Sequence, residues 1–200
     1  MTNAAHMPKT ATERGRVAPA KLAHFVRRTS RLKEMVAWYR QVLEAECAYS
    51  NEMLAFMTYD DEHHRVAFIA IPGLEDPPPN TTGTDHIAFT YGSLDDLLHT
   101  YSRLKQVGIE PFWSINHGPT TSLYYKDPDN NSIELQIDNF ETAAEVDEWM
   151  KGGTFEENPI GVVFDPDDLV ARHKAGVPFR ELVERPPLPD GKTPFDMLRI

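Results

Sequence analysis

Two histidines at equivalent places in a repeat, together with one carboxylate, are the residues of this chain best suited to hold a metal. His24 lies in the run Lys21-Leu-Ala-His-Phe-Val, and His86 follows 62 residues later in Thr84-Asp-His-Ile-Ala-Phe-Thr. Glu134 alternates with apolar neighbours, and a carboxylate in such a strand is costly unless something compensates its charge. Two neutral imidazoles and one carboxylate favour non-haem Fe(II) or Mn(II) with open positions for reactants. The alternative is that both histidines pack within strands and Glu134 lies at an edge.

The elements that must position these residues repeat with the same offset of 62 residues. Arg31–Leu43 carries apolar residues at the spacing of one helix face, and Ser93–Val107 repeats that face. A strand-like run with a histidine precedes each helix. Three more strand-like runs follow each helix: Ala45–Ser50, Leu54–Tyr59 and Arg65–Ile71, then Glu110–Ile115, Thr121–Lys126 and Ser132–Ile137. The sequence therefore predicts two strand–helix–strand–strand–strand modules.

These modules define the expected domain organisation and fold class. One sheet of four strands cannot cover both of its faces, so the two modules are expected to pair. The fold class is α+β, with paired βαβββ modules that form a cup-like mixed sheet around a metal site, and with a C-terminal helical and extended extension. In chain order the expected parts are a flexible arm (1–20), the first module (21–71), a Pro-rich linker (72–83), the second module (84–139) and the C-terminal extension (140–200).

The alternation of side chains indicates which strand faces line the cup. In Asp85–Tyr91 the large apolar side chains point one way, while His86, Ala88 and Thr90 point the other. Ser132–Ile137 behaves in the same way, with Glu134 on the polar side. We therefore expect the apolar faces to pack on the helices and the polar faces to line the interior of the cup.

Composition excludes several classes of function. The chain has 200 residues, of which 40% are hydrophobic, and a formal net charge of −11. No apolar run is long enough to span a membrane, and a phosphate backbone favours a basic partner rather than an acidic one. The single cysteine, Cys47, cannot form a disulfide within the chain. These features predict a cytoplasmic protein that binds neither nucleic acid nor a membrane.

Two segments carry a resemblance to a known family. The run from Asn116-His117 through Leu123-Tyr124 and Asp127-Pro128 to Glu134 resembles the signature of type I extradiol catechol dioxygenases. These enzymes belong to the vicinal oxygen chelate superfamily, whose members build paired βαβββ modules into metal-holding cups. The run His63-His64-Arg-Val-Ala-Phe is similar to a second segment of the same enzymes. One departure is Asn130, which stands where the family has Gly or Pro; Asn tolerates the left-handed turn conformation.

The resemblance implies an activity and a role for each site residue. His24, His86 and Glu134 are expected to hold Fe(II), with Mn(II) as the alternative. His64 is expected to act as the acid–base catalyst, and the remaining two groups, His117 and Tyr124, to orient the substrate by hydrogen bonds. The expected reaction is extradiol cleavage of a catechol-type aromatic diol by O2, with both oxygen atoms incorporated, in a homodimer. The alternatives are a glyoxalase-like metal-dependent isomerase or transferase and a non-catalytic small-molecule-binding protein of the same fold.

Overall fold

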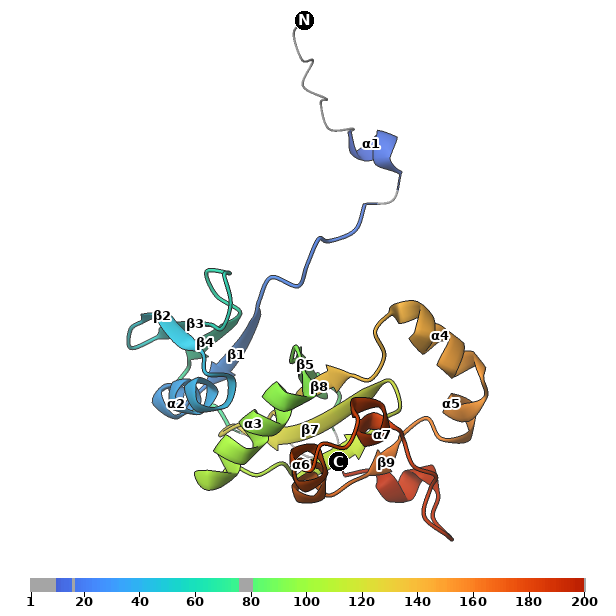
Figure 1. Cartoon of the computed structure of the whole chain (residues 1–200). Coiled ribbons are helices and arrows are strands. Elements are labelled where there is room, and N and C mark those ends of the chain that lie inside the picture. The colour runs from blue at the N-terminus through green and yellow to red at the C-terminus, as the bar shows by residue number, and fades with distance from the viewer. Residues whose placement is uncertain (1–9, 16, 76–80, 200) are drawn as a thin grey trace, which may run out of the picture.

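Two modules of the same element order form the body of the protein, and a C-terminal extension follows them (Figure 1). The computed structural model describes residues 10–15, 17–75 and 81–199, so Pro77–Pro79 of the expected linker lie outside the described residues. A short helix, α1 (Ala11–Arg14), precedes the modules. The first module contains β1 (Phe25–Thr29), α2 (Leu32–Leu43), β2 (Glu46–Ser50), β3 (Leu54–Thr58) and β4 (Val66–Ala70). The second contains β5 (His86–Thr90), α3 (Leu94–Gln106), β6 (Trp113–Asn116), β7 (Thr120–Lys126) and β8 (Ser132–Asp138). The predicted order of elements is confirmed in both halves.

Each module forms one mixed sheet. The strand order is β1-β4-β3-β2 in the first sheet and β5-β8-β7-β6-β9 in the second. The first strand of each module pairs in parallel with the last, and the remaining pairs are antiparallel. In the second sheet Ala88, Glu134, Tyr124 and Trp113 are register partners across four neighbouring strands. Directly paired residues share a face, so these four side chains form one row across the sheet.

The two modules pack against each other through one shared core, which confirms the expected pairing. The ring of Phe25 in β1 lies 6.1 Å from the ring of Phe89 in β5, measured between centroids. The hydroxyl of Tyr39 in α2 donates to the Asp127 carboxylate in the second module at 3.1 Å. One contact joins a strand of each sheet and the other joins α2 to the turn after β7, so both hold the first module against the second.

Helices α2 and α3 form because their apolar residues recur on one face and cover the outer side of each sheet. The buried residues of α2 are Met35, Tyr39 and Val42, and α3 buries its equivalent face. The Ser93 side chain accepts a hydrogen bond from the Asp96 amide and caps the start of α3. Gly108, two residues after α3, has a φ of +76°, the left-handed conformation in which glycine commonly ends a helix.

Two strands begin later than the sequence predicts. The run from Glu110 was expected to be a strand, but β6 starts at Trp113 because Pro111 has no amide hydrogen for the ladder. In the first module β1 starts at Phe25, so His24 lies just before the strand instead of within it. There the Arg65 guanidinium donates to the carbonyls of Leu22 and Ala23, at 2.8 and 3.0 Å, which replaces strand pairing in this stretch.

The C-terminal extension contains more regular structure than the sequence predicts. The spacing of apolar residues predicts a helix over residues 141–151 and another over 165–173, and both are confirmed as α4 (Ala143–Lys151) and α6 (Pro166–Lys174), with the Asp165 side chain capping α6. The Pro-rich remainder predicts extended chain, which is wrong in part. It also contains α5 (Thr154–Glu157), β9 (Val162–Val163), α7 (Phe179–Val183) and the 3₁₀ helix η1 (Pro194–Met197). These short elements carry too few residues for a periodic pattern to reveal them.

The extension covers two parts of the second module. Leu169 of α6 and Leu182 of α7 join the core shared by the two modules. Strand β9 pairs with the edge strand β6, and Met197 of η1 joins a separate apolar cluster around Trp113. The Trp113 indole donates to the Met197 carbonyl at 2.9 Å. Among the described residues, no helix is long and apolar enough to cross a membrane.

Strand β8 is the element on which both the core and the site depend, because it lies between β5 and β7. Leu135 has no exposed surface and points into the shared core. We expect Leu135→Ala to lower the free energy of unfolding by about 2–5 kcal/mol, because it leaves a cavity in packed surroundings. Urea unfolding measures this loss. Asp138→Ala, at an exposed position of the same strand, should change stability by less than about 0.5 kcal/mol.

Candidate functional site

The second module brings three of the predicted site residues into contact. The Glu134 side chain is only 6% exposed, and its Oε2 lies 3.0 Å from His86 Nε2. Tyr124 is the register partner of Glu134 on the neighbouring strand, and the negative charge of Glu134 acts on its hydroxyl. The ring of His86 lies edge-on to the ring of Tyr124, with 5.2 Å between centroids. Strands β5, β8 and β7 are neighbours in the sheet, so their pairing register produces this cluster.

The hydrogen bonding of His86 fits a cation at Glu134. His86 Nδ1 lies 2.6 Å from the carboxylate of Asp85, while Nε2 faces the carboxylate of Glu134. A neutral imidazole has one N–H, so it satisfies only one of these two acceptors. With the proton on Nδ1, the lone pair of Nε2 and the Glu134 oxygen both point at the same place, as two ligands of one ion do. A histidine ligand that donates its other N–H to a carboxylate is a common arrangement in metal sites.

His117 extends the cluster away from the sheet. It follows β6, and its Nε2 lies 3.0 Å from the Tyr124 hydroxyl. Its Nδ1 donates to the carbonyl of Ile160, in the extension, at 2.5 Å. Burial lowers the pKa of the His117 imidazole below its ordinary value, which favours the neutral ring at pH 7. His117 thus contacts Tyr124, which lies opposite Glu134 in the sheet, while the roles expected of these residues stay predictions.

Tyr124 is held in a state that donates hydrogen bonds. Burial, reinforced by the negative charge of Glu134, raises the pKa of the Tyr124 hydroxyl far above its ordinary value. The hydroxyl therefore keeps its proton at neutral pH. The ring of Trp113 packs on the Tyr124 ring with 4.6 Å between centroids, and both belong to the apolar cluster that η1 covers. Packing thus fixes the direction of the hydroxyl.

His64 belongs to the first module and lies on its cup face. It stacks on the ring of Phe56, with 4.7 Å between centroids and an interplanar angle of 18°. The ring of His24 lies 4.4 Å away on another side. Burial, together with the positive charges of His63 and His24 in their protonated forms, lowers the pKa of His64. A neutral imidazole at pH 7 is the form that accepts a proton.

His24 is the predicted ligand that does not join the pair in the second module. Its ring is exposed and lies against His64. Across the parts of the chain that the structure describes, no three His, Cys, Asp or Glu side chains lie together in a way that would hold one metal ion. The pair of His86 and Glu134 is therefore in place, and the set of three ligands stays a prediction.

The turn between β7 and β8 explains why Tyr124 and Glu134 meet. Asp127 is buried, and its carboxylate accepts hydrogen bonds from the amides of Asp129 and Asn131, at 3.0 and 2.9 Å. Asn130 has a φ of +62°, so the residue that departs from the family pattern does adopt the left-handed conformation expected of it. This closed turn sets the register in which Tyr124 lies opposite Glu134.

Three residues at the site were missed by sequence reasoning. Asp85 precedes His86 and was not given a role, although an acidic neighbour of a candidate ligand is a recognisable signal. Ile160 contributes a backbone carbonyl, which no residue type reveals. Arg185 donates to the carbonyl of His117 at 3.2 Å from a segment that was expected only to be extended. The last two contacts depend on how the extension folds back onto the module.

Similarity to known proteins extends over most of the chain. Residues 21–135 match the Glyoxalase/Bleomycin resistance protein/Dioxygenase superfamily. The chain is 47% identical over 167 residues to biphenyl-2,3-diol 1,2-dioxygenase 3 of Rhodococcus globerulus, which covers 82% of this chain and 88% of that relative. It is 48% identical over 162 residues to biphenyl-2,3-diol 1,2-dioxygenase 2 of the same organism, with coverage of 80% and 85%.

A solved structure shares the fold. The crystal structure of a glyoxylase/bleomycin resistance protein/dioxygenase domain from Frankia sp. EAN1pec superimposes with a TM-score of 0.51 at 17% identity. The match covers 60% of this chain and 99% of the Frankia domain. The two dioxygenase alignments, by contrast, cover too much of the chain to fit within residues 1–139, so they reach into the extension.

Proposed function

The chain belongs to the glyoxalase/bleomycin resistance protein/dioxygenase superfamily, and we infer that it is an extradiol ring-cleaving dioxygenase. We propose that its substrate is a catechol with an aryl substituent, of the biphenyl-2,3-diol type. The diol and O2 are the two reactants, and the ring opens at the carbon–carbon bond beside the diol. Both oxygen atoms enter the product.

One observation carries this proposal. The contacts from His86 through Glu134 and Tyr124 to His117 place a metal-binding pair beside a hydrogen-bonding pair. An isomerase that only polarises its substrate needs the first pair. A catechol dioxygenase also needs groups that orient a hydroxylated ring and handle its protons. The near-half identity to two biphenyl-2,3-diol dioxygenases agrees with this choice.

We propose that His24, His86 and Glu134 hold Fe(II), with Mn(II) as the alternative, since the two metals prefer the same ligands. When bound, this metal supplies a Lewis acid for the diol and an electron path between the diol and O2. The contact between His86 and Glu134 supports two of the ligands. His24 is supported by its repeat-related position. It also lines a cavity of about 210 Å³ together with Ala88, the register partner of Glu134.

The other predicted site residues handle protons and orientation. Tyr124 keeps its proton at neutral pH and donates to an oxygen of the substrate. His117, neutral and fixed by its contact with Ile160, presents Nε2 toward the same region. His64, also favoured in the neutral form, accepts a proton from a substrate hydroxyl when the diol binds and returns it after ring opening.

An aromatic wall beside Tyr124 accounts for the aryl substituent. Trp113 packs directly on Tyr124, and the ring of Phe112, the residue before β6, lies 6.3 Å from the Tyr124 ring between centroids. Phe112 is 38% exposed, so its ring offers a surface to a second aromatic ring. Trp38, by contrast, lies against Tyr39 on α2 and packs against the shared core.

Two further predictions from the sequence belong to this proposal. The lone cysteine, Cys47, supports a cytoplasmic location, because the chain forms no disulfide of its own. A homodimer is part of the proposal as well, and light scattering on the purified protein tests it.

Oxygen consumption tests the proposed reaction. The full chain, loaded with Fe(II) under anaerobic conditions, is mixed with biphenyl-2,3-diol or unsubstituted catechol in aerated buffer. We expect one O2 consumed per diol and a yellow ring-opened product, with kcat/KM higher for the aryl-substituted diol. Mass spectrometry after reaction under labelled O2 should find both labelled atoms in the product.

Hydroquinone is the matched control substrate, because its two hydroxyls are not adjacent and cannot chelate one metal. It should give neither oxygen consumption nor colour. If the Fe(II)-loaded protein left both biphenyl-2,3-diol and catechol intact, the dioxygenase assignment would be overturned. Tight binding of a diol without turnover would favour a binding protein instead.

A further inference from the structure

The His117 imidazole is bonded at both nitrogens, and one of the two partners decides where its proton lies. Nδ1 lies 2.5 Å from the Ile160 carbonyl, and Nε2 lies 3.0 Å from the Tyr124 hydroxyl. A carbonyl oxygen only accepts hydrogen bonds, so Nδ1 must be the donor. In the neutral ring Nε2 then has no hydrogen and accepts from Tyr124. The Ile160 carbonyl therefore selects one tautomer of His117.

The extension delivers this carbonyl through a tight approach of two backbones. Strand β9 pairs with β6, which brings Gly161 against the Asn116 carbonyl. A Cβ at Gly161 would lie 2.4 Å from that oxygen, and the residue has a φ of +118°, so only glycine fits. The buried Asn158 side chain accepts from the Ile160 and Gly161 amides at 3.1 and 2.9 Å. The loop that carries the carbonyl is thus held closed by its own hydrogen bonds.

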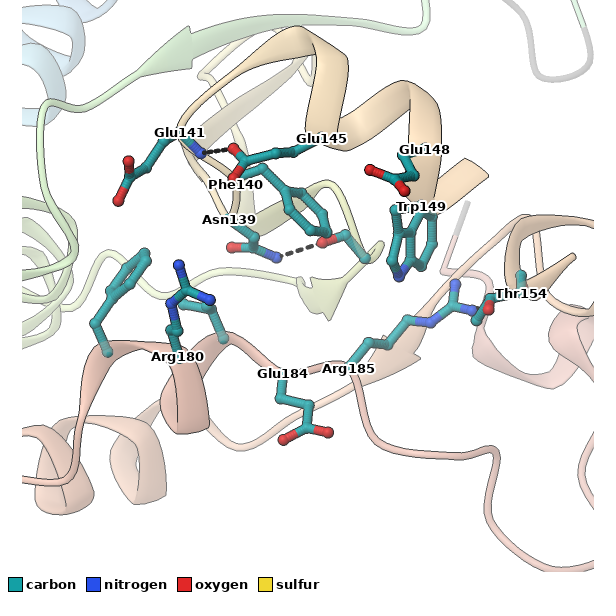
Figure 2. Close-up of a pocket in the computed structure, with 13 residues that line it drawn as sticks. Asn139, Phe140, Glu141, Glu145, Glu148, Trp149, Thr154, Arg180, Glu184 and Arg185 are labelled. Carbon is teal, nitrogen blue, oxygen red and sulfur yellow. Dashed lines mark hydrogen bonds between the residues drawn. The ribbon is translucent and has the colours of Figure 1, made fainter. Parts of the chain in front are cut away.

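Arg185 joins this loop to the His117 segment. Its Nη1 donates to the Asn158 carbonyl at 2.7 Å and to the His117 carbonyl at 3.2 Å. Its Nη2 donates to the Thr154 carbonyl at 2.8 Å. Figure 2 shows the side chain extended toward Thr154 beside Trp149, and the guanidinium lies 4.9 Å from the Trp149 ring centroid. Arg185 therefore binds the segment that contains His117 and also the loop that contains Ile160. It holds the two close enough for the hydrogen bond between His117 and Ile160.

Trp149 supports the same segment from the other side. The indole lies against Gly118, the residue after His117, where an added Cβ would come within 2.2 Å of the ring. Gly118 has a φ of +100°, so the turn that directs His117 requires glycine for its conformation and for the close approach of Trp149. Helix α4, which carries Trp149, thus acts together with Arg185 on one turn.

We propose that Arg185 is a positioning residue that, by clamping the extension to the His117 segment, fixes His117 as the Nδ1–H tautomer, in which Nε2 accepts the hydrogen bond of the Tyr124 hydroxyl. The choice of tautomer follows from the contacts alone. Its catalytic consequence rests on the proposed function: when the diol binds, a diol hydroxyl replaces Tyr124 as the donor to Nε2, and the Tyr124 hydroxyl then donates to a diol oxygen.

A planar guanidinium is what this geometry needs. The carbonyls of Thr154, Asn158 and His117 all accept hydrogen bonds from Arg185, and only a guanidinium has enough N–H groups in a rigid plane to bind them together. Its flat face also packs on the Trp149 ring. Lysine keeps the charge and the length but offers one ammonium group. Arg185→Lys is therefore the informative variant, because it preserves the packing of the stem and removes the fork.

The tautomer of His117 is read directly by ¹⁵N NMR of histidine-labelled full chain loaded with diamagnetic Zn(II), with His117→Gln used to assign the signal. We expect the Nδ1–H form in the unmodified protein and a rising share of the Nε2–H form in Arg185→Lys. With Fe(II) and biphenyl-2,3-diol, kcat of Arg185→Lys should fall by about 10–100-fold, the usual cost of losing a group that orients a site residue. Iron content should stay unchanged.

Arg180→Lys is the matched control. Arg180, on α7, and Arg185 both line one cavity of about 700 Å³ (Figure 2). It should change neither the tautomer nor kcat. An Arg185→Lys protein that keeps the Nδ1–H form and full kcat would overturn the proposal, as would a fall in kcat that follows only a lower melting temperature. If the unmodified protein turned over no catechol, the proposed function would fail while the NMR result still decided the role of Arg185.

Discussion

Glu134→Gln is expected to lose iron and, with it, nearly all turnover. The amide keeps the size of the side chain and an oxygen beside His86, but it removes the one negative charge that the protein gives to the proposed metal. Loss of an outer partner of a metal ligand costs about 10–100-fold in affinity, so loss of the charged ligand should exceed about 100-fold. Titration with Fe(II) under anaerobic conditions measures this change, and the iron content of the purified protein provides a second reading.

Gln136→Ala is the control for Glu134→Gln. Gln136 lies on the same face of β8, two residues further along, and its amide donates to the Thr90 hydroxyl at 3.1 Å. Its removal should leave iron binding intact. Full iron occupancy in Glu134→Gln would contradict the ligand assignment, because Glu134 and its neighbour His86 define the centre of the site.

His64→Ala is expected to keep iron and lose about 10²–10⁴-fold in kcat, the range for a positioned acid–base group. His64 is outside the proposed ligand set, so the variant separates proton transfer from metal binding. Its ring also packs on His24 and Phe56. Iron content must therefore be measured on the same sample as kcat, and a stable metal load shows that His24 has kept its place.

His99→Ala is the control variant, because His99 is exposed on α3 and its loss removes a histidine away from the site. It should match the unmodified enzyme in kcat and iron content. Undiminished turnover in His64→Ala would mean that another group accepts the proton, and the resemblance around His63 and His64 would then have misplaced the catalyst.

The repeat made the modules predictable. Leu32, Met35, Val36 and Tyr39 reappear 62 residues later with the same face, and the strand-like runs around them repeat as well. Periodic burial is a property of each segment, so it can be read without knowledge of the partner segments. The same holds for Tyr124 and Glu134. Each lies in a strand whose apolar and polar side chains alternate, and one closed turn joins the two strands.

Contacts made by loops and by isolated backbone groups were not predictable in this way. His24 shares its repeat position with His86, yet Arg65 bonds the backbone just before it, and β1 begins one residue later. The register of the repeat therefore located the residue but not the direction of its ring. The Ile160 carbonyl carries no signal at all, since every residue has one. Only the pairing of β9 with β6 places it beside His117.

The clamp at Arg185 has a consequence for how the enzyme is made. Arg185 lies 68 residues after the His117 carbonyl that it binds. While the chain is being synthesised, the segments that carry His86, His117 and Glu134 emerge before the segment with Arg185. The extension also adds Leu169 and Leu182 to the core that the two modules share. The orientation of His117 and the completion of the core therefore depend on the same late event, the folding of the extension onto the second module.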